Sequence, residues 1–179
     1  AAQYLYYIYH KNSRNISKDD AQLINENIYV GPSFSDTEII KFLDSKNIPY
    51  ESFDRESLLK KTAQLIADGN IVGWYQGKME WGPRALGNRS ILADPRREDM
   101  KDILNAKIKH RESFRPFAPS ILEEYASEYF EIDVPSPYML MVAPVKKPKE
   151  IPAVTHVDGT GRLQTVSKNT NPLYYDLIS

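Results

Sequence analysis

The stretch DRESLLKKTAQLIADGNIVGWY (Asp54–Tyr75) decides the fold of this chain of 179 residues. Asp54 is a residue type that caps helix N-termini, and apolar side chains recur behind it at helical spacing to about Asp68. Gly69-Asn70 then ends the helix, because both residues accept the left-handed conformation found after a helix. Ile71–Tyr75 is apolar and bounded by turn residues, which indicates a strand. A helix followed directly by a strand favours a sheet with helices on its faces.

The rest of the chain continues this alternation. Ser35 and Glu38 have the spacing of a capping box, which predicts a helix whose apolar side begins at Ile39. Further strands are expected at Ile28–Val30, Ala118–Leu122, Tyr138–Ala143 and Arg162–Val166, and further helices at Arg97–Lys107, Glu123–Tyr129 and Asn171–Ile178. The pattern therefore predicts an α/β (α+β) protein, without fixing the order or direction of its strands.

Composition excludes several classes of protein. Hydrophobic residues make up 41% and charged residues 26% of the chain, as in an ordinary globular domain and unlike a disordered tail. The 23 Lys and Arg against 24 Asp and Glu give a net charge of -1, so bulk charge does not favour nucleic acid or a membrane surface as partner. Cysteine is absent, which excludes disulfides and thiolate chemistry. No apolar run approaches the roughly 20 residues that span a bilayer, and no signal peptide is recognisable. We expect a cytoplasmic protein.

Positive charge is nevertheless concentrated between Lys78 and Arg115. This segment holds ten Lys or Arg and six Asp or Glu, a balance of +4, which leaves 13 basic and 18 acidic residues elsewhere. A run of charges alone usually describes a solvated helix face. The residue types around these charges, however, point to an anion site.

Glycines bracket the first arginine of this segment. Gly82 and Gly87 flank Arg84, and glycine lets backbone amides approach an anion while an arginine clamps phosphate or carboxylate. The alternative is a structural turn, in which Arg84 and Arg89 pair with nearby carboxylates such as Glu80 or Asp94.

A second group of cations follows in NAKIKHRESFRPF (Asn105–Phe117). A cation at a helix C-terminus gains about 0.3–1 kcal/mol from the helix dipole, so one or two need no ligand. This group holds four, and we predict that Lys109, Arg111 and Arg115 converge on one polyanion. Because it precedes Pro116, Arg115 is expected at the entrance of a strand.

The stretch THVDGTGRLQTV (Thr155–Val166) repeats the theme of glycines, hydroxyls and an arginine. Asp158-Gly159 is typical of a hairpin turn, after which Arg162 and Gln164 would share one strand face. The His-x-Asp pair that begins at His156 is either a metal pair or a hydrogen-bonded loop, and a single such pair favours the loop.

Three blocks together strongly resemble the C-terminal part of the O-carbamoyltransferases of the nodulation-factor, cephamycin and tobramycin type. They are GWYQGKMEWGPRALGNRSILADPR (Gly73–Arg96), MKDILNAKIKHRESFRPFAPSIL (Met100–Leu122) and PAVTHVDGTGRLQTV (Pro152–Val166), about 60 of the 179 residues. The resemblance implies that residues 23–179 form a YrdC-like domain, a twisted open sheet with helices packed on it and a concave basic face. It also implies that residues 1–22 are the tail of an upstream domain and a linker.

The resemblance further implies an enzyme that uses ATP. The YrdC-like domain would form carbamoyl-adenylate from carbamoyl phosphate and ATP, with Mg²⁺ on the nucleotide and release of pyrophosphate. An upstream domain of the same polypeptide, holding Fe²⁺ or a similar metal, would pass the carbamoyl group to a hydroxyl acceptor that the sequence does not identify. A family segment, Asn-Thr-Ser-Phe-Asn, would follow Ser179, so we expect a domain that is incomplete at its C-terminus and inactive alone.

Carried over motif by motif, the resemblance implies a set of residues that contact the polyanion. Arg84, Lys109 and Arg115 are the expected catalytic residues, and Arg162 joins them in binding ATP or carbamoyl phosphate. The weaker candidates for this binding role are Asn88, Arg89, Arg111 and Gln164. No metal site is expected in this part of the chain.

Two other functions stay open at this point. Aromatic residues interleave with the cations as on a single-strand RNA platform, although their apolar strand contexts favour the core. These residues are Trp74, Tyr75, Trp81, Phe114 and Phe117. Alternatively, the chain is a non-catalytic docking domain whose tyrosine-rich start, Ala1–His10, packs against a partner.

Overall fold

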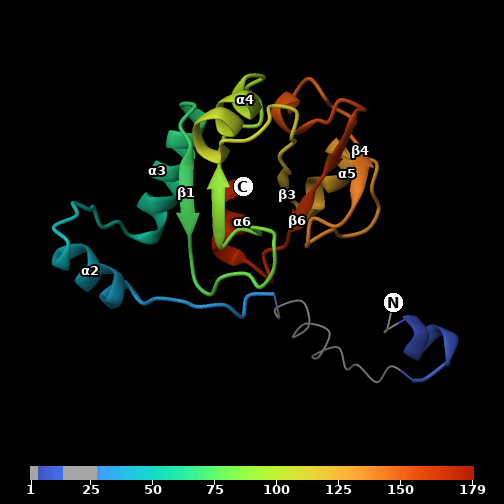
Figure 1. Cartoon of the computed structure of the whole chain (residues 1–179), viewed down its shortest axis with the longest axis horizontal. Helices are drawn as coiled ribbons and strands as arrows, with labels where there is room; N and C mark the ends of the chain where they lie inside the picture. Colours follow the sequence, from blue (N-terminus) through green and yellow to red (C-terminus); the bar gives the residue numbers. More distant parts are fainter. Residues whose placement is uncertain (1–3, 14–27) are drawn as a thin grey trace.

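The computed structural model describes residues 4–13 and 28–179, whose arrangement Figure 1 shows. The helices are α2 (Asp36–Ser45), α3 (Arg55–Ala67), α4 (Met100–Leu104), α5 (Ala126–Tyr129) and α6 (Pro172–Ile178). The strands are β1 (Val72–Tyr75), β2 (Arg89–Leu92), β3 (Ser120–Leu122), β4 (Val142–Pro144), β5 (Thr160–Arg162) and β6 (Gln164–Val166). Four short turns of π- or 3-10 helix complete the list: η1 (Tyr4–Tyr9), η2 (Asn105–Lys109), η3 (Glu123–Tyr125) and η4 (Pro152–Val154).

The described strands pair two by two into three open sheets. β1 and β2 are antiparallel, with Trp74 opposite Ser90, and β4 and β5 are antiparallel as well. β3 and β6 are parallel, with Ser120 opposite Gln164. The predicted mixture of helices and open sheets is confirmed, and the sheet is divided into pairs rather than continuous.

Local signals placed the first two long helices correctly. The Ser35 hydroxyl accepts the Glu38 amide at 3.3 Å, and the Glu38 carboxylate accepts the Ser35 amide at 2.8 Å, so the predicted capping box is confirmed. The Asp54 carboxylate accepts the Ser57 amide at 2.8 Å at the start of α3. Each cap satisfies amides that would otherwise have no partner within the helix.

Several predicted strands are wrong or shorter than expected. Residues 28–30 form no strand, and the strand expected over 138–143 is confined to β4. The strand expected over 162–166 divides at Leu163, because β5 pairs with β4 whereas β6 pairs with β3. The helix expected from Arg97 begins at Met100 and continues as the π-helical η2. Strand β2 was not predicted from the sequence.

One cluster of the core joins β1 to the C-terminal helix α6. Trp74 of β1, Val166 of β6, and Tyr174 and Leu177 of α6 form one buried cluster, against which Leu58 of α3 packs. Figure 1 shows α3 and α6 beside the β1–β2 pair. This packing fixes the loop between β1 and β2 with respect to β6.

Other parts of the described chain expose apolar side chains. Helix α2 has no buried residue and stands away from the rest of the fold in Figure 1. Leu5, Tyr6, Ile8 and Tyr9 of η1 are also exposed. Within the described residues, no helix has the length and apolar character needed to cross a membrane.

Candidate functional site

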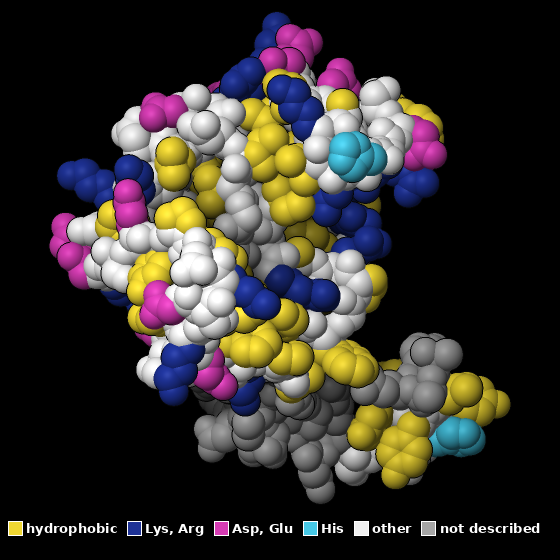
Figure 2. Space-filling model, turned by 60° about the vertical axis from the view of Figure 1, so that its left-hand side comes forward, with side chains coloured by type: hydrophobic (Ala, Val, Ile, Leu, Met, Phe, Trp, Pro, Cys, Tyr) yellow, Lys and Arg dark blue, Asp and Glu magenta, His cyan; other side chains and the backbone are white. Residues whose placement is uncertain are grey.

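A cavity of about 550 Å³ collects cations from three separated stretches of sequence. The cationic residues that line it are Arg84, Arg96, Lys109, Arg111 and Arg162. Asp94 is its one acidic lining residue among those described. Lys and Arg side chains gather on the right-hand side of the face drawn in Figure 2, next to apolar side chains. The cavity is therefore suited to a ligand with several negative charges.

Arg84 extends from the glycine-rich loop between β1 and β2. Gly82 has a φ of 125° and Gly87 a φ of 106°, a region that residues with a Cβ rarely adopt. The Arg84 side chain is exposed at the cavity and has no hydrogen bond or ion pair with any described residue. All of its donors are thus available to a ligand.

Arg162 lies at the end of β5 and is only partly exposed. Its Nε atom is buried and has no hydrogen-bond partner among the described residues. Burial, and then the positive charge of Arg84, lower the pKa of the Arg162 guanidinium. Leaving a buried donor unpaired costs about 1–3 kcal/mol, and an anion held between Arg84 and Arg162 would remove both that cost and the repulsion.

Arg111 is held in place before any ligand arrives. Its Nε donates to the side-chain oxygen of Asn105 at 2.7 Å, and its guanidinium lies 4.7 Å from the centre of the Phe117 ring. Asn105 is fully buried and donates in turn to the backbone carbonyls of Ser113 at 3.2 Å and Arg115 at 3.0 Å. This network fixes the chain reversal that follows Lys109, the last residue of η2.

The chain reversal separates two of the predicted catalytic residues. Lys109 lines the cavity and has no hydrogen bond or ion pair with a described residue. Arg115 does not line the cavity, because its side chain is turned toward Glu112, with Nε 2.9 Å from the carboxylate. The structure therefore brings Lys109 and Arg111 together with Arg84 and Arg162, and it leaves Arg115 outside. It also places Arg115 in a loop rather than at the entrance of β3.

Arg89 is engaged by the protein itself. Its Nε lies 3.1 Å from the buried carboxylate of Glu80, and its Nη2 donates to the backbone carbonyl of Gly82. Pairing with Glu80 is the structural alternative that the sequence left open. Arg89 does not line the cavity.

Asn88 and Gln164 are buried and hydrogen-bonded within the fold. Asn88 donates to the backbone carbonyl of Lys78 at 2.8 Å, and Gln164 donates to that of Leu86 at 2.9 Å. The Ser120 hydroxyl donates to the side-chain oxygen of Gln164 at 3.0 Å. Both residues hold the glycine-rich loop against its neighbours, and neither lines the cationic cavity.

Sequence reasoning missed Arg96 as a lining residue. Its guanidinium is 2.7 Å from the carboxylate of Asp94, which also accepts the Arg96 amide at 2.9 Å. The hydrogen bond from Arg96 lowers the pKa of the Asp94 carboxyl. Because the two charges offset each other, the net positive charge of the cavity comes from the four remaining cations. The spacing of acid and base around Pro95 was the available signal.

An apolar wall also lines the cavity. Ile66 of α3, Leu92 of β2, and Leu177 and Ile178 of α6 contribute to it. A flat apolar group joined to a polyanion would therefore find surfaces for both of its parts in one cavity.

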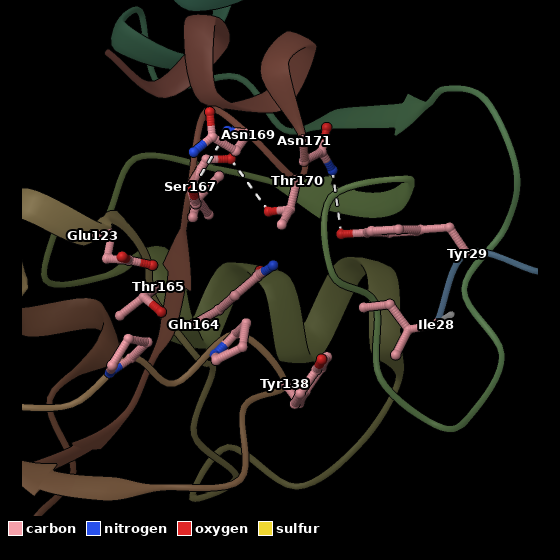
Figure 3. Close-up of a pocket in the computed structure, with 13 residues that line it drawn as sticks. Ile28, Tyr29, Glu123, Tyr138, Gln164, Thr165, Ser167, Asn169, Thr170 and Asn171 are labelled. Atoms are coloured by element: carbon pink, nitrogen blue, oxygen red, sulfur yellow. Dashed lines mark hydrogen bonds between the residues drawn. The ribbon is translucent and has the colours of Figure 1, made fainter. Parts of the chain in front are cut away.

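A second cavity, of about 410 Å³, differs in chemistry. Figure 3 shows side chains from β6 and the segment after it around this cavity, together with Tyr29, Glu123 and Tyr138. Asn171 donates to the hydroxyl of Tyr29 at 3.3 Å. No Lys or Arg among the described residues lines this cavity, so it is the less suited of the two to a polyphosphate.

The possible metal pair in the third stretch is a hydrogen-bonded loop. The Thr160 hydroxyl donates to the carboxylate of Asp158 at 2.7 Å and lies 3.1 Å from Nδ1 of His156. Within residues 4–13 and 28–179, no group of three or more His, Asp or Glu is placed to hold a metal ion.

Comparison with known proteins identifies a family. The model of the family described as "Carbamoyltransferase C-terminus" matches residues 63–179. A curated relative, nodulation protein NolNO of Sinorhizobium fredii, is 48% identical over 86% of this chain and 24% of its own length. The 3'-hydroxymethylcephem-O-carbamoyltransferase of Amycolatopsis lactamdurans is 46% identical over 64% of this chain and 22% of its own length.

A third relative aligns with nearly the whole chain. An uncharacterized protein of Synechocystis sp. is 44% identical over 99% of this chain and 32% of its own length. The chain thus spans about a quarter to a third of the curated relatives that it matches here.

Proposed function

This chain belongs to the carbamoyltransferase C-terminal family, and from that premise we propose that it is the part of an O-carbamoyltransferase that makes carbamoyl-adenylate from carbamoyl phosphate and ATP. The observation that carries the proposal is the cavity in which Arg84, Lys109, Arg111 and Arg162 meet. The buried Nε of Arg162 fits it, since a phosphate oxygen would supply the acceptor that this atom lacks.

The chemistry requires charge and orientation rather than a base. Hydrolysis of carbamoyl phosphate yields carbamate and inorganic phosphate. An oxygen of carbamate then attacks the α-phosphorus of ATP, and the bond from that phosphorus to the leaving pyrophosphate breaks. The nucleophile is already an anion, so no general base has to remove a proton. The site has to hold several anions close together and stabilise the charge on the transferring phosphorus and the leaving group.

The described residues are suited both to holding several anions close together and to stabilising the charge that develops on them. Arg84 approaches the cavity from the glycine-rich loop and Arg162 from the end of β5, and each offers several donors in a planar arrangement that matches phosphate. Arg111, already fixed by Asn105, needs little further ordering to bind an oxygen. The wall around Ile66 and Leu177 would take the adenine ring. Mg²⁺, entering with ATP as substrate, would offset charge on the phosphates.

The remaining step belongs to the longer polypeptide of this family. We propose that an upstream domain, with the metal ion that the resemblance implies, transfers the carbamoyl group to a hydroxyl acceptor. The printed name of the Amycolatopsis relative, a hydroxymethylcephem-O-carbamoyltransferase, supports transfer to oxygen. The length of the relatives supports the presence of further domains.

Binding of ATP by the purified chain tests the proposal directly. We expect ATP and pyrophosphate to bind by calorimetry, and Arg162→Ala to weaken both by about 10- to 100-fold, since hydrogen bonds to charged groups contribute about 1.5–3 kcal/mol. Arg55→Ala is the matched control, because Arg55 forms a surface ion pair with Asp176 outside the cavity. In a full-length family member, pyrophosphate release that depends on carbamoyl phosphate should fall in parallel. A chain that binds neither ATP nor pyrophosphate would contradict the proposal.

A further inference from the structure

We infer that Glu80 is a positioning residue of this site: its buried carboxylate fixes the glycine-rich loop in the conformation that presents Arg84 to the polyanion. The inference rests on the proposed function, and it gives a role to a residue that the sequence analysis treated only as a possible ion-pair partner. Glu80 does not line the cavity, so it acts through Arg84.

The Glu80 carboxylate is the centre of a compact hydrogen-bond network. Its side chain is fully buried. One oxygen, Oε1, accepts the backbone amides of Leu86 at 2.6 Å and of Asn88 at 2.8 Å. The other oxygen, Oε2, accepts Nε of Arg89 at 3.1 Å. A single side chain thus replaces the strand partners that this part of the loop does not have.

The network fixes both ends of the loop that carries Arg84. Leu86 and Asn88 follow Arg84, and Glu80 bonds them directly. On the other side, Arg89 reaches from Glu80 to the backbone carbonyl of Gly82. Between these two attachments lie Pro83, Arg84 and Ala85, and the Arg84 side chain has no hydrogen bond or ion pair with a described residue. The backbone therefore sets the point at which the Arg84 side chain leaves the loop, and Glu80 holds that backbone together with the bonds of Asn88 and Gln164.

A charged group is needed for this role. A buried carboxylate costs several kcal/mol of solvation unless it is paired and fully hydrogen-bonded. Glu80 recovers that cost through three donors, one of them a guanidinium. Its charge also neutralises Arg89, which leaves Arg84 as the cation of this loop that faces the cavity. The anion is thereby directed to Arg84 rather than to its neighbour.

A double-mutant cycle with the full chain separates positioning from a general contribution to folding. Glu80→Gln keeps an oxygen for the two amides but sets an amide group against Arg89. In the parent protein, we expect Glu80→Gln to weaken pyrophosphate and ATP binding by about tenfold. In Arg84→Ala, which should itself bind about tenfold more weakly, Glu80→Gln should cause no further loss. The measurement is calorimetry at one salt concentration, with the melting temperature of each variant recorded alongside.

Three outcomes distinguish the possibilities. An equal loss of affinity from Glu80→Gln in both backgrounds, or no loss in either, overturns this inference while the proposed function stands. Absence of nucleotide binding in the parent protein overturns the proposed function instead. Should Glu80→Gln fail to fold, Arg89→Gln replaces it in the cycle. That change affects an exposed side chain, removes the hydrogen bond to the Gly82 carbonyl and keeps the hydrogen bonds from the Leu86 and Asn88 amides to Glu80. Its effect on ligand affinity is again expected to disappear in Arg84→Ala.

Discussion

Arg84 and Arg162 line one cavity, and the positive charge of Arg84 contributes to lowering the pKa of the Arg162 guanidinium. Two cations at one cavity repel each other, and a negatively charged ligand would relieve this repulsion. Arg97 with Asp99 shows the more usual arrangement, in which a cation is matched by an acid.

The first prediction separates Lys109 from Arg115. Lys109→Ala removes a cation from the cavity and should weaken ATP binding about tenfold. Arg115→Ala removes a cation that is paired with Glu112 outside the cavity, and it should change the affinity less than twofold. Calorimetric titration of each variant with ATP measures the two affinities. Equal losses would show that Arg115 moves into the site when the ligand binds.

The second prediction concerns salt, which distinguishes a nucleotide pocket from an RNA surface. Binding to an extended polyanion releases counterions, so the logarithm of the affinity falls with the logarithm of the salt concentration, and more steeply the more phosphates are contacted. Trp81 and Phe114 are exposed, whereas Trp74 is buried in the core. We expect ATP affinity to fall by less than about tenfold between 50 and 200 mM salt, and a single-stranded RNA to bind weakly throughout. Tight RNA binding with a steep salt dependence would favour the RNA-binding function instead.

The third prediction concerns Gly87, where the backbone conformation disfavours a side chain and the neighbouring Tyr174 leaves no room for one. Its φ is 106°, and an added Cβ would lie 2.8 Å from Cγ of the buried Tyr174 ring. Gly87→Ala should therefore lower the free energy of unfolding by about 2–4 kcal/mol. Gly73→Ala is the matched control, because a Cβ there meets no atom within 4 Å, and it should change stability by less than about 0.5 kcal/mol. Urea unfolding compares the two; similar values for both variants would contradict the packing of Gly87 on Tyr174.

The fourth prediction is a dependence of stability on alkaline pH. Burial raises the pKa of Tyr174 from 10.0 to about 12, so the folded state keeps this phenol neutral while the unfolded chain ionises. The resulting stability is complete below pH 10 and is lost as the pH rises toward 12, by about 1.4 kcal/mol per pH unit.

Tyr174→Phe tests this dependence. The variant loses the hydrogen bond from the phenol to the Ser120 hydroxyl, so it should be about 1 kcal/mol less stable at neutral pH. It should also lose less stability than the parent between pH 9 and 11. Parallel decline of the two proteins, measured by urea unfolding at each pH, would rule out Tyr174 as the group responsible.

Helix starts, which depend on residues close together in the sequence, were predictable from it. The caps at Ser35 and Asp54 are set by side chains three residues apart, and both were located correctly. Pairing between distant strands was not predictable. Nothing near Arg162 indicates that the strand divides at Leu163, because the division follows from two different partners, β4 and β3.

The same distinction applies to the candidate site. The concentration of cations around Arg84 and Lys109 is visible in the sequence, and the structure places both at one cavity. Which cations are already engaged is not visible, since it depends on where Glu80 and Glu112 lie in space. A glycine-rich loop with many amides and one acidic residue was the signal that could have identified Glu80.

The parallel alignment of β3 with β6 has a consequence for how the protein is made. Antiparallel neighbours can meet through a tight turn, whereas this pair joins Ser120 to Gln164 across a long crossover, and α6 must follow before Tyr174 reaches Trp74. During synthesis on the ribosome, the glycine-rich loop emerges well before the residues that enclose it. If the cavity binds nucleotide as proposed, a nascent chain would acquire that affinity only after β6 and α6 have formed, and a peptide excised around Arg84 would have none.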